Sequence, residues 1–374
     1  MGAGRLIQIV PRRALAPEGV GDYARQIAER LRDEHGVITS FVSGTPLPPV
    51  QRRQDEWQTL ELGRRSARGM LEALAKLEAE HGDAPILLHL SAYGYQDKGV
   101  PFWLAAALRR WRRAHPATPL ITVFHELFAT GPIWSSPFWV GRAQAGVARA
   151  VQRLSDAGLA TTEQYVDTLR SWRAEPLIWW MPCFSTIGEP AQRVPAAASQ
   201  RPARLVIFGR SGLLRTVYAG ELPVLADFVR ANAITEIVDI GDRPSPPPAE
   251  IAGVPVLSRG ELDPVSLGAE LAQARFGLVH YDADRLAKSS IFAAYCAYRV
   301  IPVCIGTAAG NRDRLAPGRE YVKLVPGISA EPLSTAVMED LQARAEAWYE
   351  PHAIGSTVRL IQQLVGEQRT PTAE

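Results

Sequence analysis

The chain has 374 residues, of which 47% are apolar and 21% are charged, as in an ordinary globular protein. This length favours about two domains. Its 41 Lys and Arg residues nearly balance its 39 Asp and Glu residues, giving a formal net charge of +2. A dedicated nucleic-acid-binding protein normally carries a strong basic excess, so we expect no nucleic-acid partner. Three cysteines, none in a C-x-x-C pair, exclude a disulfide framework and argue against a structural zinc site.

The N-terminal apolar run at 6–10 is too short for a signal peptide. No apolar stretch approaches the roughly 18–20 residues that a membrane-spanning helix needs. We therefore expect the protein to be made and kept in the cytoplasm, with peripheral contact to the inner face of the membrane left open.

Short apolar runs alternate with helical patterns along the first half of the chain. Repeated strand–helix–strand units of this kind predict a parallel sheet that is covered by helices on both faces. The expected strands are 6–10, 37–42, 86–90, 120–124 and 157–161, and the expected helices are 23–33, 64–80, 102–114, 141–154 and 165–173.

The proline-rich segment 182–202 interrupts this rhythm and is typical of a crossing between domains. A second alternating series follows it, so we predict an α/β protein with two doubly wound Rossmann-like domains facing a cleft. The second series contains expected strands at 204–208, 236–240, 276–280 and 300–305 and expected helices at 217–232, 289–298, 333–348 and 357–365.

A glycine-containing loop lies between the first strand and the first helix. Gly19 and Gly21 permit close backbone approach, and the following helix N-terminus offers N–H groups to an anion or a sugar hydroxyl. The loop does not match G-x-G-x-x-G. The alternative is a plain strand-to-helix turn with Asp22 as the helix cap.

Two polar residues follow the strand predicted at 120–124. His125 and Glu126 stand at its carboxyl end, which is where ligands bind in such sheets. A neutral imidazole can hold a substrate hydroxyl or transfer a proton, and the alternative is a histidine satisfied by a backbone carbonyl. His89 ends the preceding strand and is a weaker, more structural candidate, and His280 ends a strand of the second half.

The second half offers two candidate anion sites. Arg210 and Arg215 lie in a glycine-containing turn after the strand at 204–208, and guanidinium groups match phosphate oxygens. Lys288, Ser289 and Ser290 open an apolar helix, where hydroxyl and N–H groups favour an anion. The alternatives are a solvated loop for the arginines and a serine N-cap for the helix. The Walker P-loop frame and metal-ligand spacing are both absent.

Taken in order, these motifs resemble the GT-B fold retaining glycosyltransferases that use nucleotide sugars (glycosyl transferase group 1, family 4-like). The segment 19–24 is similar to the family's glycine loop, and His125 to its acceptor-side histidine. Residues 209–215 resemble the Gly-Arg…Lys pair that holds the donor diphosphate, with arginine in place of lysine. Residues 183–188 and 348–349 resemble the interdomain and C-terminal crossing segments.

One departure from the family concerns its paired glutamates, which stand eight positions apart before a Gly-x-Pro-Val element. The corresponding positions here are Ala287 and Tyr295, and Val300 stands at the glycine position. In the family these acids contact the donor sugar and the ribose. Their loss puts the selectivity for nucleotide and sugar in doubt.

The resemblance implies an acceptor-binding domain at 1–183, joined by a C-terminal helix at about 349–370, and a donor-binding domain at 203–348. It implies transfer of a hexosyl group from a nucleotide-diphosphate sugar to a glycan or lipid-linked glycan, with retention, as in polysaccharide biosynthesis. No metal or cofactor is expected, because positive side chains would stabilise the leaving diphosphate. The expected catalytic residues are His125, Arg210 and Lys288, the donor residues Gly19, Gly21, Gly209, Arg210, Arg215, Lys288, Ser289 and Ser290, and the acceptor-side residues Asp22, Tyr23 and Glu126.

Two other functions stay open on the sequence. One is a catalytically silent module of the same fold that binds a sugar or a partner glycosyltransferase. The other is a sugar-nucleotide epimerase or hydrolase.

The segment 101–115 carries four arginines around Trp111 and has Phe102 and Trp103 near its start. A basic helix with tryptophan can lie on an anionic bilayer, and the loop at 133–139 would add apolar contact. The alternative is an ordinary covering helix with solvated arginines.

Overall fold

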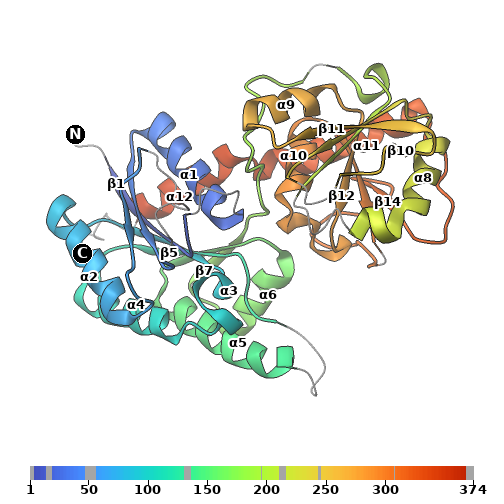
Figure 1. Ribbon diagram of the computed structural model, residues 1–374. Helices are drawn as coiled ribbons and strands as arrows, with labels where there is room; N and C mark the ends of the chain where they lie inside the picture. Colours follow the sequence, from blue (N-terminus) through green and yellow to red (C-terminus); the bar gives the residue numbers. More distant parts are fainter. Residues whose placement is uncertain are drawn as a thin grey trace. The chain divides into compact units, whose positions relative to one another are not determined.

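The computed structural model describes residues 4–13, 19–46, 56–129, 136–194, 196–209, 216–242, 246–306 and 308–367. The chain forms two compact units, one made of Met1–Pro182 with Ile354–Glu374 and the other of Cys183–Ala353. Each unit contains a seven-stranded sheet with helices packed on it (Figure 1). The predicted class, an α/β chain with two doubly wound Rossmann-like units, is confirmed.

The sheet of the first unit has the strand order β3-β2-β1-β4-β5-β6-β7, with every neighbouring pair parallel. The order reverses between β1 and β4, because β2 and β3 lie on one side of β1 and the later strands on the other. In such sheets the reversal point is where ligands bind, beyond the carboxyl ends of the strands. The strands are β1 Arg5–Val10, β2 Ile38–Ser43, β3 Thr59–Glu61, β4 Ile86–Leu90, β5 Leu120–Phe124, β6 Ala157–Ala160 and β7 Leu177–Trp180.

The first helix of this unit begins earlier than the apolar pattern predicts. Tyr23, Ile27 and Leu31 repeat every four residues and are buried, which explains one apolar face. The helix starts at Gly19, so Asp22 lies in the first turn, and the alternative in which Asp22 caps the helix is wrong. The helices are α1 Gly19–His35, α2 Ala67–His81, α3 Ala92–Tyr95, α4 Phe102–Ala114, α5 Ser136–Leu154, α6 Glu163–Trp172 and α12 Ile354–Glu367.

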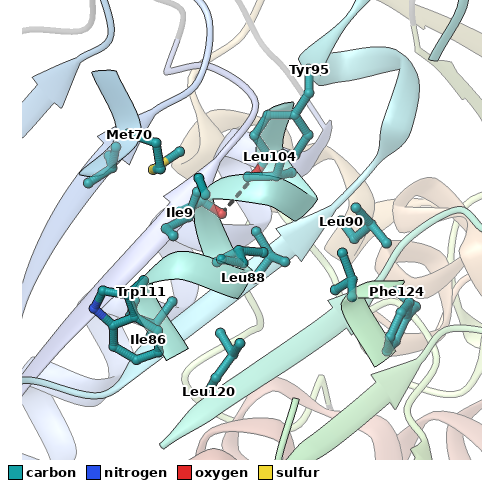
Figure 2. Packing of buried hydrophobic residues seen from close by; sticks show 14 of the residues in the cluster. Ile9, Met70, Ile86, Leu88, Leu90, Tyr95, Leu104, Trp111, Leu120 and Phe124 are labelled. Atoms are coloured by element: carbon teal, nitrogen blue, oxygen red, sulfur yellow. Dashed lines mark hydrogen bonds between the residues drawn. The ribbon is translucent and has the colours of Figure 1, made fainter. Parts of the chain in front are cut away.

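The core of the first unit lies between its sheet and the helices α2, α4 and α5. Figure 2 shows Trp111 of α4 beside Ile86, with Leu104 and Met70 in the same cluster. The Tyr95 hydroxyl donates a hydrogen bond to the backbone oxygen of Ile9 at 3.1 Å. Trp111 is only 5% exposed, so its predicted place on a membrane-facing surface is wrong.

The sheet of the second unit has the order β10-β11-β9-β8-β12-β13-β14, and only the short β10–β11 pair among these is antiparallel. Its strand order reverses between β8 and β12. The strands are β8 Arg204–Phe208, β9 Glu236–Ile240, β10 Glu250–Ile251, β11 Val254–Gly260, β12 Phe276–His280, β13 Ile301–Ile305 and β14 Val322–Leu324, and the helices are α8 Leu222–Ala231, α9 Pro264–Gln273, α10 Ser290–Ala297 and α11 Thr335–Tyr349.

A tyrosine and a glycine fit together in the core of the second unit. Tyr295 of α10 is fully buried, and its hydroxyl donates to the backbone oxygen of Leu278 at 2.8 Å. Its ring occupies the space that a side chain at position 277 would need, because a Cβ on Gly277 would come within 2.4–2.6 Å of three ring atoms.

None of the described helices is long and apolar enough to cross a membrane.

Candidate functional site

Three polar side chains meet at the carboxyl edge of the first sheet, around its reversal point. Gln8 is on β1, His89 is the penultimate residue of β4, and His125 follows β5 directly. The His89 Nδ1 and His125 Nε2 atoms are 3.1 Å apart, and the His89 Nε2 and Gln8 Oε1 atoms are 2.7 Å apart. Gln8 and His89 are fully buried, and His125 is 8% exposed. The predicted residue His125 is therefore the outer end of a buried polar chain.

Burial keeps His89, the middle residue of these three side chains, uncharged. It lowers the pKa of His89 well below the usual range for histidine, and the neighbouring His125 lowers it further. Tyr23 of α1 packs its ring perpendicular to that of His125, with 4.9 Å between the ring centroids. Ser91 donates a hydrogen bond to Glu126 Oε2 at 3.1 Å. The structure thus brings Tyr23, His125 and Glu126 together, and it adds Gln8, His89 and Ser91.

The glycines predicted to bind the donor lie at the start of α1. Gly19 is exposed and Gly21 is buried, and both belong to the first helical turn. Asp22 lies beside them with its carboxylate 4.0 Å from Arg25. Residues 14–18 of the same loop lie outside the described part of the chain. The donor role of these glycines stays a prediction.

In the second unit, predicted donor residues follow the two strands that flank the reversal point. Gly209 follows β8 and has a φ of 151°, a conformation that favours glycine. Lys288 ends a short 3-10 helix, Ala283–Lys288, that follows β12, and Ser289 and Ser290 open α10 directly after it. Arg210 and Arg215 lie outside the described residues. Gly209 and the segment that leads to Lys288 therefore begin at the same edge of this sheet, and the ligand-binding role of these residues stays a prediction.

The serine beside the lysine has a structural role already. Ser289 accepts a hydrogen bond from the backbone N–H of Phe292 at 3.2 Å and caps α10. Lys288 is half-buried. It lies close enough to Cys183 for its charge to oppose the effect of burial, which raises the pKa of that thiol to about 12. Lys288 therefore contributes positive potential at the strand edge, and Cys183 stays a neutral thiol.

A third polar residue of the second unit, His280, was assigned no role from the sequence. His280 ends β12, and its Nδ1 atom is buried without a hydrogen-bond partner in the described structure. A buried polar atom without a partner costs free energy that a bound ligand or water can recover. Its signal in the sequence was its position at a strand end, the same signal that identified His125.

The positions of the family's paired glutamates are both inside the core. Ala287 is 1% exposed, and Tyr295 is fully buried with its hydroxyl on strand carbonyls. Burial also raises the pKa of Tyr295 far above its usual range. Neither side chain is placed to contact a ligand from these positions.

The second unit also contains a cavity of about 570 Å³ away from these residues. Its polar lining is bonded internally, since the Tyr349 hydroxyl donates to Glu189 and accepts from the Ser185 N–H. Arg193 and Arg299 both pair with Glu346. No predicted site residue lines it.

No group of three His, Cys, Asp or Glu side chains could hold a metal ion in the part of the chain that the structure describes. No protein-family model and no curated sequence matches the chain.

Solved structures do resemble it over nearly its whole length. A glycosyltransferase from Rickettsia africae has a TM-score of 0.61 at 11% identity and covers both chains fully. An alpha-glucosyltransferase in complex with UDP-glucose and DNA has a TM-score of 0.55 at 12% identity, over 98% of this chain and all of the other. A lipopolysaccharide outer core galactosyltransferase in its apo form has a TM-score of 0.56 at 10% identity, over 97% and 99%. At these identities the similarity shows the fold, that of GT-B glycosyltransferases, and leaves the activity open.

Proposed function

We propose that this protein is a glycosyltransferase that moves a sugar from a nucleotide-diphosphate sugar to an acceptor hydroxyl. The observation that carries the proposal is the position of the donor candidates. Gly209 and Lys288 follow the two strands that flank the reversal point of the second sheet, the usual ligand position in this fold. Named glycosyltransferases among the structural neighbours, one of them with UDP-glucose bound, support the same reaction class.

The chemistry that the side chains could supply is mainly electrostatic. When the bond between the sugar's anomeric carbon and the diphosphate breaks, negative charge develops on the diphosphate. Lys288, together with Arg210 and Arg215, which follow β8 in the sequence, would stabilise that charge without a metal ion. His125 would orient the sugar. Retention of configuration follows from the family resemblance and belongs to the proposal.

A second function is favoured by the two glutamate positions. Ala287 and Tyr295 are buried, so the ribose and sugar contacts that the family's acids make have no equivalent there. A catalytically silent module that binds a sugar or a partner enzyme would not need those contacts.

Incubation with a panel of nucleotide sugars separates the two functions. We expect nucleoside diphosphate to be released with at least one donor in the presence of an acceptor. Absence of release with every donor, together with no thermal shift by any nucleotide, would favour the silent module. Release without any acceptor would indicate a hydrolase.

Charge deletion tests the donor site directly. Lys288→Ala and Arg210→Ala should each weaken binding of a nucleoside diphosphate by about 1.5–3 kcal/mol, the size of a hydrogen bond to a charged group. Lys76→Ala is the matched control, because that lysine is 60% exposed on α2. Calorimetry with the diphosphate and the monophosphate measures the difference. Equal affinity for both nucleotides, or unchanged affinity in both variants, would remove the donor-site assignment.

The acceptor side of the proposal includes a lipid-linked glycan at an anionic membrane. Phe102 at the start of α4 and Trp139 on α5 are 63% and 65% exposed. Three of the four arginines on α4 are exposed as well, namely Arg109, Arg110 and Arg113. Arg112, the fourth, donates hydrogen bonds to the backbone oxygens of Thr118 and Leu154. Exposed aromatic and basic side chains of this kind support binding to an anionic surface.

A further inference from the structure

Gln8, His89 and His125 form a buried line of side chains from three neighbouring strands of the first unit. The two imidazole rings are within 23° of parallel, which suits an in-plane hydrogen bond between the nitrogens 3.1 Å apart. Further hydrogen bonds hold the backbone of both histidines. The Tyr95 hydroxyl shares its proton between the backbone oxygens of Ile9 and His89, at 3.1 and 3.0 Å, and the His125 N–H donates to the Leu90 oxygen at 3.0 Å.

The direction of every hydrogen bond in this line follows from its inner end. The Gln8 Nε2 atom is 3.1 Å from the backbone oxygen of Ala24, which can only accept. The amide nitrogen of Gln8 therefore points to Ala24, since the flipped amide would place two oxygens in contact. The Gln8 Oε1 atom then faces His89 Nε2 at 2.7 Å and can only accept, so His89 carries its proton on Nε2.

The position of the proton on His125 follows from that on His89. Because burial keeps His89 neutral, its Nδ1 atom has a lone pair and no proton. That atom faces His125 Nε2 at 3.1 Å, so His125 must donate from Nε2. In neutral His125 the lone pair is then on Nδ1.

We propose that Gln8 and His89 are positioning residues that hold His125 as the Nε2-protonated tautomer, so that His125 accepts a hydrogen bond from a substrate hydroxyl through Nδ1. The substrate part rests on the proposed function, whose substrate class, a sugar or sugar acceptor, supplies hydroxyl donors. The tautomer itself depends only on the buried line of side chains.

Ring-nitrogen NMR of the ¹⁵N-histidine-labelled full chain tests the tautomer without any assumption about activity. We expect the neutral form of His125 to show a protonated Nε2 and an unprotonated Nδ1 in spectra recorded above the pH at which this ring titrates. Gln8→Glu, held protonated by this buried site so that its O–H replaces the amide donor towards Ala24, keeps an acceptor towards His89 and should preserve this pattern. Gln8→Leu removes the acceptor and should give a mixture of tautomers. His115 is the internal reference, because its partners Trp111 and Glu78 lie outside the line.

Transfer activity gives the second readout. Gln8→Leu should lower kcat/KM roughly tenfold, the size of one lost hydrogen bond, and Gln8→Glu should restore most of it. A wild-type His125 protonated on Nδ1 overturns the proposal whether or not the Gln8→Leu chain folds. Unchanged tautomers and unchanged transfer in folded Gln8→Leu overturn the role of Gln8. If the wild-type protein transfers no sugar to any acceptor, the proposed function and the substrate part fail, and the NMR pattern alone decides the tautomer.

Discussion

The contact between Gly277 and Tyr295 makes a sharp prediction about Gly277→Ala. The new Cβ would lie 2.4–2.6 Å from three atoms of the tyrosine ring, whereas unstrained carbon atoms stay about 3.5–4.0 Å apart. The ring cannot retreat easily, because Tyr295 is fully buried, its hydroxyl is bonded to Leu278, and Phe208 packs on it at 5.4 Å between centroids. Overpacking of a core costs about 1–3 kcal/mol, and we expect the upper part of that range.

Urea unfolding of the full chain measures this loss in the transition that belongs to the second unit. Gly220→Ala is the matched control in the same unit. No atom lies within 4 Å of its added Cβ, and Gly220 is exposed in the π-helical turn Val217–Glu221, so alanine there should add up to about 1 kcal/mol of stability. If Gly277→Ala were as stable as the wild-type protein, the ring would be free to move. The conclusion that Tyr295 belongs to the core and away from the nucleotide would then be refuted.

Three further variants test the site and its surroundings. Tyr295→Phe should lower the stability of the fold by about 1 kcal/mol and leave nucleoside diphosphate affinity unchanged in calorimetry, since the lost bond is to a strand carbonyl. Burial lowers the pKa of His352 to about 4, with Arg314 adding to the shift. Between about pH 6.5 and 4 the unfolded chain therefore binds a proton that the folded chain does not. The free energy of unfolding then decreases by up to about 1.4 kcal/mol for each unit by which the pH is lowered. His352→Gln should remove that part of the slope in denaturation curves at several pH values, and an unchanged slope would contradict the assignment. Phe102→Ser with Trp139→Ser should reduce flotation with anionic liposomes but not change the small recovery with neutral ones, and equal recovery of the wild-type protein with both would end the membrane proposal.

Much of the fold was predictable because its central strands are short, continuous apolar runs. The strands β4, β5, β8 and β12 have the predicted bounds, since both faces of a covered parallel sheet are buried. The edge strands β3 and β14 have three residues each and are only partly buried, so no apolar run marks them.

One missed element did carry a readable signal. The helix α9 begins after Asp263, which caps it, with Pro264 in its first position, and this pair is typical of a helix start. Among its large apolar residues only Leu267 and Leu271 repeat at helical spacing and are buried, so the apolar pattern alone did not reveal the helix.

The candidate site shows where sequence reasoning reaches its limit. The position of His125 at a strand end was visible, but its partner His89 is 36 residues away and Gln8 is 81 residues from His89. Only the strand order, with β1 between β2 and β4, brings the three together. The glycine loop and the arginines were identified by type and spacing, and part of that region lies outside the described residues.

The path of the chain has a consequence for how the protein is made. The first unit is interrupted by residues 183–353 and completed by α12, which packs against α1 and β5. Ile354, Val358, Ile361 and Leu364 of this helix are at most 5% exposed, and burying such side chains is worth about 1.5–3 kcal/mol each. The sum is comparable with the whole stability of a typical domain. A ribosome therefore delivers the continuous second unit before the first can be closed, so the histidine-bearing sheet is the last part of the molecule to reach its final stability during synthesis.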